Sequence, residues 1–185
     1  HTIILGDTDG LAGGQDTIIL DQLPSIVTVH DLPDDALGYP VRDTVDVDGR
    51  GGLDTYIVNL SGELTDYRVN VLDTGAAGDG ADTLTINGTT EADILLLRRS
   101  TSIPNHTADE PAFVALVKGS LDQVLANTET RPEELERINY DNNIDGRLTV
   151  NGLGGNDYFA SDDNSSLTTL DGGEGADTFQ VGQIF

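Results

Sequence analysis

The chain of 185 residues contains no cysteine, methionine or tryptophan, and aromatic residues make up only 5% of it. Without cysteine, neither a disulfide framework nor a thiolate metal site can form. The scarcity of large aromatic side chains argues against a large irregular globular core. No apolar run approaches the roughly 20 residues that a membrane-spanning helix needs, so we expect no membrane span.

The first residues, His1-Thr2-Ile3-Ile4, lack the charged and then apolar plan of a signal peptide. The chain also lacks an initiator methionine and stops abruptly at Gln183-Ile184-Phe185. We therefore interpret residues 1–185 as a single segment excised from a longer protein.

Basic residues are few as well, because 9 Lys and Arg stand against 33 Asp and Glu, for a net charge of −24 and a pI near 4.1. Such a charge repels nucleic acid and anionic membranes and strains a compact chain through self-repulsion. A hydrophobic content of 37%, with many short β-branched runs, argues against disorder. Since the acids are mostly Asp beside Gly, we expect bound cations to balance the charge.

A short motif occurs five times, at residues 14–18, 52–56, 80–84, 155–159 and 175–179. Each copy has Gly two residues before an Asp and a large apolar residue two residues after it. Glycine supplies the positive φ angles of a tight turn. Because side chains alternate between the faces of a strand, the Asp and the apolar residues share one face. The motif predicts a glycine turn that leads into a strand.

Further short strands are predicted before several turns, at 45–47, 69–71 and 148–150, and in the middle of the chain at 94–97, 113–117 and 137–140. The motif Asp residues are 38 (16 to 54), 28 (54 to 82), 75 (82 to 157) and 20 (157 to 177) residues apart. The last step fits one coil of a β-solenoid. The expected inner face consists of Ile18, Leu20, Tyr56, Val58, Leu84, Ile86, Phe159, Phe179 and Val181.

The gap of 75 residues must hold extra coils or an insertion, and we expect a loop-rich insertion at residues 99–136. A degenerate copy of the motif lies just before it at 91–95, where the glycine two residues before Asp93 is missing. Residues 130–134, Thr-Arg-Pro-Glu-Glu, are typical of the cap and first turn of a short helix.

The turns resemble the calcium-binding repeats of the haemolysin-type, or RTX, family, whose consensus is G-G-x-G-x-D-x-U-x with U apolar. Residues 172–179, Gly-Gly-Glu-Gly-Ala-Asp-Thr-Phe, match it in full, and residues 152–159 and 49–56 lack one glycine and gain another beside it. Family repeats run in uninterrupted tandems, whereas the copies here are separated. The resemblance implies an all-β fold, a right-handed parallel β-helix of the β-roll kind, with wider coils as in giant bacterial surface proteins.

The resemblance also implies the metal ligands, because in the family the motif Asp of one turn and glycine carbonyls of the next turn hold Ca²⁺. Carried over to this chain, the first ligands are Asp157 and Asp177, followed by Asp54 and Asp82. Asp48, Asp73, Asp79 and Asp171 assist, Asp16 is a further candidate, and the glycines are Gly52, Gly80, Gly155 and Gly175.

Three alternatives compete with this interpretation. Asp and Gly are common turn formers, so single copies need no metal. Residues 141–146 begin like an EF-hand loop, but Gly152 occupies the position of the bidentate Glu, which favours an ordinary Asx-rich turn. Arg98, Arg99, His106 and Lys118 could line the cleft of a polysaccharide-active β-helix enzyme. We expect a non-enzymatic protein.

The predicted function is that of a calcium-ordered stalk or spacer in an adhesin-like bacterial protein, secreted or at the cell surface. Its expected partners are calcium ions and neighbouring repeat segments of the same chain. An alternative is a glycan- or protein-binding module that uses the loops of the insertion.

Overall fold

A computed structural model describes residues 15–21, 44–62, 67–75, 80–104, 106–117, 119–126 and 135–182. This part of the chain is almost entirely β-structure. The elements are β1 Thr17–Asp21, β2 Thr44–Val47, β3 Thr55–Asn59, β4 Tyr67–Val71, β5 Thr83–Asn87, β6 Ile94–Arg99, β7 Ala112–Val117, α1 Leu121–Ala126, β8 Leu135–Tyr140, β9 Arg147–Asn151, β10 Tyr158–Asp162, β11 Thr168–Asp171 and β12 Thr178–Val181. The predicted short strands are confirmed.

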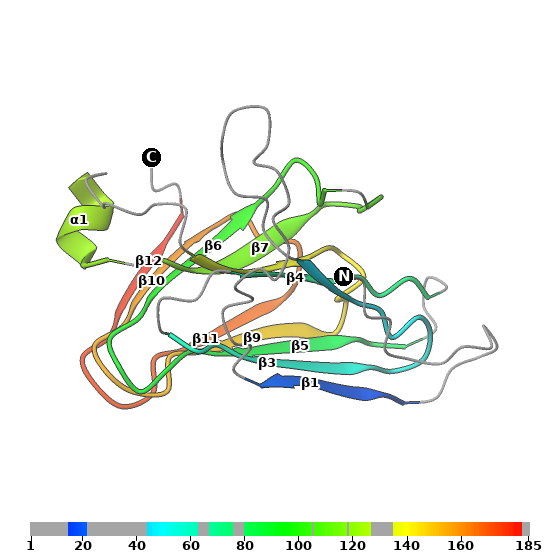
Figure 1. The fold of residues 1–185 in the computed structure, drawn as a ribbon, viewed down its shortest axis with the longest axis horizontal. Helices are drawn as coiled ribbons and strands as arrows, with labels where there is room; N and C mark the ends of the chain where they lie inside the picture. The colour runs from blue at the N-terminus through cyan, green and yellow to red at the C-terminus, as the bar shows by residue number, and fades with distance from the viewer. Residues whose placement is uncertain are drawn as a thin grey trace, which may run out of the picture.

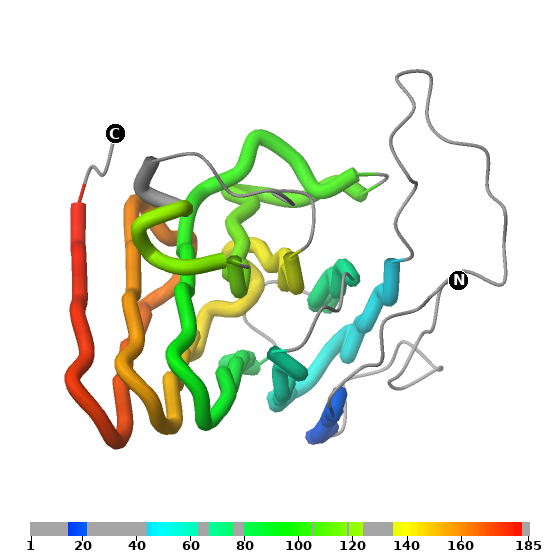
Figure 2. The backbone as a smooth tube through the Cα atoms, turned by 60° about the vertical axis from the view of Figure 1, so that its left-hand side comes forward, coloured from blue at the N-terminus to red at the C-terminus, as the bar shows by residue number. Residues whose placement is uncertain are grey.

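The strands form two sheets that face one another (Figure 1). One sheet has the order β1-β3-β5-β9-β11, and all its pairs are parallel. The other has the order β12-β10-β6-β7-β8-β4-β2, with β7 antiparallel to both of its neighbours and the remaining pairs parallel. Apart from the run β6-β7-β8, the chain alternates between the two sheets from one strand to the next. Figure 2 shows the turns before β6, β10 and β12 stacked beside one another.

The core lies between the sheets and is built from every second residue of each strand. In the five-stranded sheet, Tyr56, Leu84 and Leu148 form one row of buried neighbours, and Val58, Ile86 and Val150 form the next. The residues between the two rows, such as Ile57 and Thr85, are less buried. This alternation confirms that the motif predicts which residues face inward.

The expected core residues Phe179 and Val181 are an exception, because they are 47% and 75% exposed. Both lie on β12, which pairs with β10 and has no strand on its other side within the described residues. Their side chains face the same way as those of buried Phe159 and Ser161. The prediction of their burial was wrong, because none of the described strands covers them.

The region 99–136 contributes β7 and α1. Strand β7 forms antiparallel pairs with β6 on one side and β8 on the other. Because of this extra strand, β6 lies beside β10 while β8 lies beside β4. The predicted helix start at 130–134 lies outside the described residues. Within the described part, no helix is both long enough and apolar enough to cross a membrane.

Candidate metal site

A first row of aspartates, which we call the first ladder, links turns that lead into the five-stranded sheet. Each carboxylate after the first accepts a hydrogen bond through Oδ1 from the backbone N–H of the preceding member. The distances are 2.9 Å from Asp16 to Asp54, 2.8 Å from Asp54 to Asp82 and 3.1 Å from Asp82 to Asp145. The carboxylates thereby accept hydrogen bonds from turn N–H groups that have no partner in the strand pairing.

A second ladder links turns that lead into the seven-stranded sheet. The N–H of Asp93 donates to Oδ1 of Asp157 at 2.8 Å, and the N–H of Asp157 donates to Oδ1 of Asp177 at 3.0 Å. Short turns connect the ends of β5, β9 and β11 to the starts of β6, β10 and β12. The second ladder therefore lies at the opposite edge of the two sheets from the first.

Two glycine positions give the carboxylates and the turns the space they need. The glycine five residues before the Asp makes room for its side chain, since a Cβ would lie 2.4 Å from Oδ2 of Asp54 at Gly49 and 2.1 Å from Oδ2 of Asp177 at Gly172. The glycine two residues before the Asp allows adjacent turns to touch. A Cβ at Gly80 or Gly175 would lie 1.5 Å from the carbonyl oxygen of Gly52 or Gly155, respectively.

A group of three buried carboxylates forms where the first ladder meets the end of β4. Asp54, Asp73 and Asp82 are 0%, 3% and 4% exposed, and one carboxylate oxygen of each lies within 4.8 Å of the others. Calcium binds oxygen at about 2.3–2.6 Å, so two of its ligands can lie about 5 Å apart. The spacing of this group, which we call the carboxylate cluster, therefore fits one shared metal ion.

Tyr56 holds Asp73 in the carboxylate cluster. Its hydroxyl donates to Oδ2 of Asp73 at 2.8 Å and accepts the N–H of Gly49, also at 2.8 Å. Burial, and then the negative charge of Asp73, raises the pKa of Tyr56, so the phenol keeps its proton and stays a donor. The tyrosine on β3 thus links the turn before β3 to the carboxylate after β4.

Burial raises the pKa of Asp73 from 3.8 to about 7. Hydrogen bonds from Tyr56 and Gly75 oppose this rise, whereas the charges of Asp82 and Asp54 add to it. Bringing three carboxylates together away from water is costly unless a proton or a cation compensates them. A proton or a metal ion at the carboxylate cluster would provide this compensation.

Asp157 offers a second, smaller candidate position on the second ladder. It is 1% exposed, and its Oδ2 has no hydrogen-bond partner within the described residues. A Cβ at Gly152 would lie 2.0 Å from this oxygen and 2.7 Å from the carbonyl oxygen of Gly172. Burial is the main cause that raises the pKa of Asp157, and the charges of Asp93 and Asp177 add to it. A carboxylate oxygen and a carbonyl oxygen are thus close together near the backbone.

The other predicted ligands have different surroundings. Asp48 accepts hydrogen bonds from the N–H and hydroxyl of Thr74 at 3.0 and 2.7 Å, so it ties two turns together. Asp171 is exposed and accepts the N–H of Gly173 at 3.1 Å. Asp79 lies outside the described residues. Neither Asp48 nor Asp171 belongs to the carboxylate cluster.

The sequence interpretation missed two ladder members, Asp93 and Asp145. Asp93 lacks the glycine two residues before it but has Gly88 five residues before it, where a Cβ would lie 2.5 Å from Oδ2 of Asp93. That glycine spacing was the available signal. Asp145 precedes Gly146, whose Cβ would lie 2.8 Å from the carbonyl oxygen of Asp82. Here the glycine lies one residue after the aspartate instead of two residues before it, so the motif does not predict this member.

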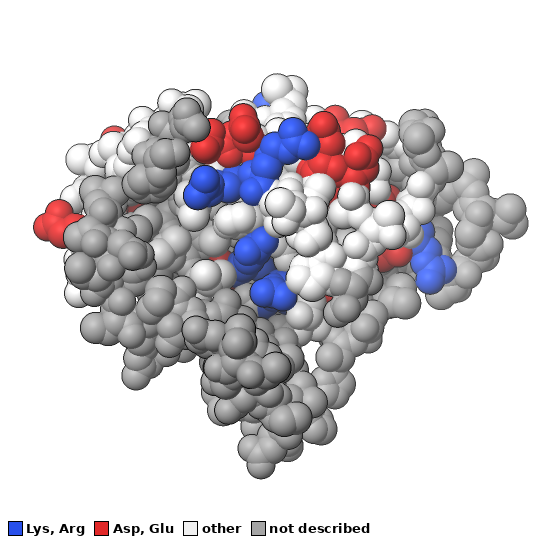
Figure 3. Space-filling model, turned by 90° about the horizontal axis from the view of Figure 1, so that it is seen from above, with Lys and Arg blue, Asp and Glu red and all other residues white. Residues whose placement is uncertain are grey.

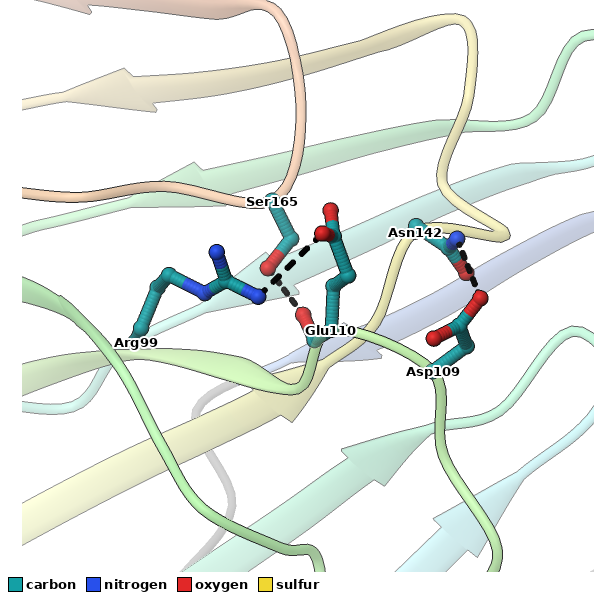
Figure 4. A network of polar contacts seen from close by, with 5 residues as sticks. All are labelled: Arg99, Asp109, Glu110, Asn142 and Ser165. Atoms are coloured by element: carbon teal, nitrogen blue, oxygen red, sulfur yellow. Dashed lines mark hydrogen bonds and ion pairs between the residues drawn. The ribbon is translucent and has the colours of Figure 1, made fainter.

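Residues 141–146 form a turn between two strands, as the sequence favoured over an EF-hand. Asp141 accepts the N–H of Asn143 at 3.1 Å, and the amide of Asn143 donates to the carbonyl of Asp73 at 2.6 Å. Asn142 donates to Asp109 at 3.1 Å, as Figure 4 shows beside the contacts of Glu110 with Arg99 and Ser165. These polar groups bind one another and neighbouring loops.

Two of the basic residues proposed for an enzymatic cleft have acidic partners. Arg99 pairs with Glu110 at 3.3 Å, and His106 lies 3.2 Å from Asp46. Lys118 lies outside the described residues. Figure 3 shows basic side chains gathered in the middle of the face above the seven-stranded sheet, with acidic side chains around them. That sheet carries Arg68, Arg98, Arg99 and Arg137.

In comparisons with models of protein families, with curated proteins and with solved structures, no match to this chain is found.

Proposed function

We propose that this chain is a calcium-ordered structural segment and that the carboxylate cluster of Asp54, Asp73 and Asp82 is its principal ion site. The observation that carries the proposal is the burial of three carboxylates within 4.8 Å of one another. Each comes from a different part of the chain, before β3, after β4 and before β5. An ion shared by them would tie successive turns together and remove their mutual repulsion.

We infer that the two sheets belong to a right-handed parallel β-helix. The alternation of strands between the sheets and the in-register parallel pairs support this fold. Parallel connections of this kind are almost always right-handed. The motif at 172–179 further supports a relationship to the RTX repeats, with separated rather than tandem copies.

Calcium is the metal that the ligand chemistry favours. Carboxylate and carbonyl oxygens suit hard cations such as Ca²⁺ and Mg²⁺, while Zn²⁺ and Cu²⁺ prefer nitrogen and sulfur. Irregular sites built from several turns suit the flexible coordination of Ca²⁺ better than the strict octahedron of Mg²⁺. The remaining ligands are backbone carbonyls and water.

The biological role that fits such a segment is a stalk or spacer in a secreted or surface-displayed bacterial protein, where calcium is present at millimolar concentration. The proposed role is structural rather than catalytic. In support of it, the ladder carboxylates of the described turns bind backbone groups of neighbouring turns.

Calcium titration of the matched variants Asp73→Asn and Asp163→Asn tests the proposal. Both remove one negative charge, but Asp163 is exposed and its φ of 47° suits Asn. At a calcium concentration of 10 to 100 times Kd, binding stabilises the folded chain by about 1.4–2.7 kcal/mol, or roughly 3–10 °C in Tm. We expect Asp163→Asn to keep this gain and Asp73→Asn to lose most of it.

The melting temperature in chelator provides the control for folding. Asp73→Asn removes a buried charge but replaces one of the two oxygens that accept hydrogen bonds from Tyr56 and Gly75. Because these effects oppose one another, we expect its Tm without calcium to stay close to that of the unmodified chain. Equal calcium-induced gains in both variants would refute the carboxylate cluster as the principal ion site. Absence of any gain in the unmodified chain would refute calcium binding altogether.

The arginines on the seven-stranded sheet support a second candidate function, a module that binds an acidic glycan. Arg137 stacks over the ring of Phe113 at 3.9 Å, and Arg98 lies next to Phe113 in the sheet register. Guanidinium groups bind carboxylates and sulfates well. Binding of a uronate polymer that is lost in Arg98→Ala and retained in Arg147→Ala, on the other sheet, would favour this function.

A further inference from the structure

The last turn of the second ladder ends in the N–H group of Asp177, which has no acceptor among the described residues. Five times in the two ladders, the N–H of a motif aspartate donates to Oδ1 of the next aspartate along the stack. Asp177 supplies such a carboxylate to Asp157. Within the described part of the chain, no hydrogen bond from the N–H of Asp177 is found. This N–H is therefore free to donate a hydrogen bond to one more carboxylate.

The apolar column of the core is likewise uncovered at this end. The rings of Phe159 and Phe179 stack with their centroids 4.9 Å apart. Phe159 is fully buried, whereas Phe179 is 47% and Val181 75% exposed. Val181 pairs in register with Ser161, which is only 6% exposed. Both exposed residues thus stand at positions that another strand covers elsewhere in the stack.

The backbone at this end is an open template for strand pairing. Among the described strands, β12 pairs only with β10, and β11 pairs only with β9. Proteins usually protect exposed edge strands with charged residues, proline or bulges. Strand β12, with the sequence Thr-Phe-Gln-Val, contains no charge and no proline. Neither a charged residue nor a proline therefore protects the edge formed by these four residues.

We propose that one further coil of the same polypeptide covers this end, with a Gly-x-Asp turn whose carboxylate accepts the N–H of Asp177. The apolar residues two and four positions after that aspartate pack on Phe179 and Val181, and the strand extends the sheet beyond β12. The proposal rests on the stacked coils of the proposed function but requires no metal ion.

The charge of the molecule favours a coil of the same polypeptide over a second copy. Two copies with a net charge of −24 each repel one another. A coil joined by a short turn has a high effective concentration at the end of the stack. The step from Asp157 to Asp177 shows that 20 residues suffice for such a coil.

The test is a chain with a second copy of residues 163–182 inserted directly after Gly182. The insertion keeps the register, because Val181 pairs with Ser161 and the N–H of Gly182 donates to the carbonyl of Ser161 at 2.9 Å, so the chain leaves β12 as it leaves β10. The N–H groups of Thr178 and Gly182 already donate toward β10, so the alternating amides of Asp177, Phe179 and Val181 point to the open side. We expect hydrogen exchange of these three amides in the original coil to slow at least tenfold, in a chain that remains monomeric.

The matched control is the same insertion with Asp177→Ala in the inserted copy, which we expect to lose most of the protection at the original Asp177. Exchange that is unchanged by the first insertion would overturn the proposal. Dimers of the unmodified chain with a protected β12 would also overturn it, because a second copy would then cover this end. Repeating the measurement in chelator separates this result from the calcium site, since protection there needs no ion.

Discussion

At the scale of single residues, the motif combines two glycine positions with different physical roles. The glycine five residues before the aspartate leaves room for a carboxylate, whereas the glycine two residues before it lets two backbones touch. In two stacked turns, the glycine that lets the backbones touch belongs to the turn that comes later in the chain. A Cβ at Gly155 would lie 2.5 Å from the backbone of Glu91, but Glu91 itself needs no such space. This explains why the copy at 91–95 tolerates a large residue there.

The variants Gly80→Ala and Gly154→Ala test this distinction. A Cβ at Gly80 would lie 1.5 Å from the carbonyl oxygen of Gly52, so the two turns must separate. We expect a loss of about 2–4 kcal/mol in the free energy of unfolding, in the upper range for single substitutions. At Gly154 the nearest atoms would be 3.8 Å away, an ordinary contact, so the change should stay within about 1 kcal/mol. Urea unfolding measures both, and equal losses would contradict the stacking role.

At the scale of the elements, the ladders make each turn depend on its neighbour. The carboxylate of Asp157 accepts the N–H of Asp93, and the N–H of Tyr158 donates to the carbonyl of Asp93 at 2.9 Å. The side-chain bond thus continues the pattern of the parallel strands into the turn. A buried N–H deprived of its acceptor costs about 1–3 kcal/mol.

Substitutions at Asp157 separate hydrogen bonding from charge. Asp157→Asn keeps an oxygen that accepts the N–H of Asp93, while burial of the ionised carboxylate is relieved. We expect its stability in chelator to match or exceed that of the unmodified chain. Asp157→Ala leaves the N–H of Asp93 unsatisfied and should cost about 1–3 kcal/mol. Thermal melting in chelator compares them, and similar losses in both would show that the charge, not the hydrogen bond, is what the turn requires.

At the scale of the whole molecule, a net charge of −24 accompanies a core lined at its edges by buried carboxylates. Burial raises the pKa values of Asp73, Asp141 and Asp157 above the ordinary 3.8. The folded chain therefore holds protons that the unfolded chain releases. Bound cations and protons are alternative ways to neutralise these groups.

Stability without metal should depend on pH in a defined direction. Between pH 4 and pH 7 the folded chain binds more protons than the unfolded chain, so the free energy of unfolding falls as the pH rises through the pKa of Asp73, about 7. Above that pH the loss is complete and stability levels off. Urea unfolding in chelator should give greater stability at pH 5 than at pH 7.5. Added calcium should raise stability at pH 7.5 more than at pH 5, and the reverse order in either comparison would contradict this account.

The local pattern of the sequence determined the strands, the glycine turns and the inward direction of Asp54, Asp82 and Asp157, because alternation and turn chemistry act within a few residues. It also predicted Asp73 as an assisting ligand, and Asp73 lies in the carboxylate cluster. Only the tertiary structure decided which aspartates meet. The pairs Asp82–Asp145 and Asp93–Asp157 are 63 and 64 residues apart in the chain, and the inserted β7 sets them by placing β6 beside β10 and β8 beside β4. The strand pairing also divides the one series of motifs into two ladders. Tyr56 holds Asp73 in the carboxylate cluster by a hydrogen bond between β3 and the end of β4, which no local pattern specifies.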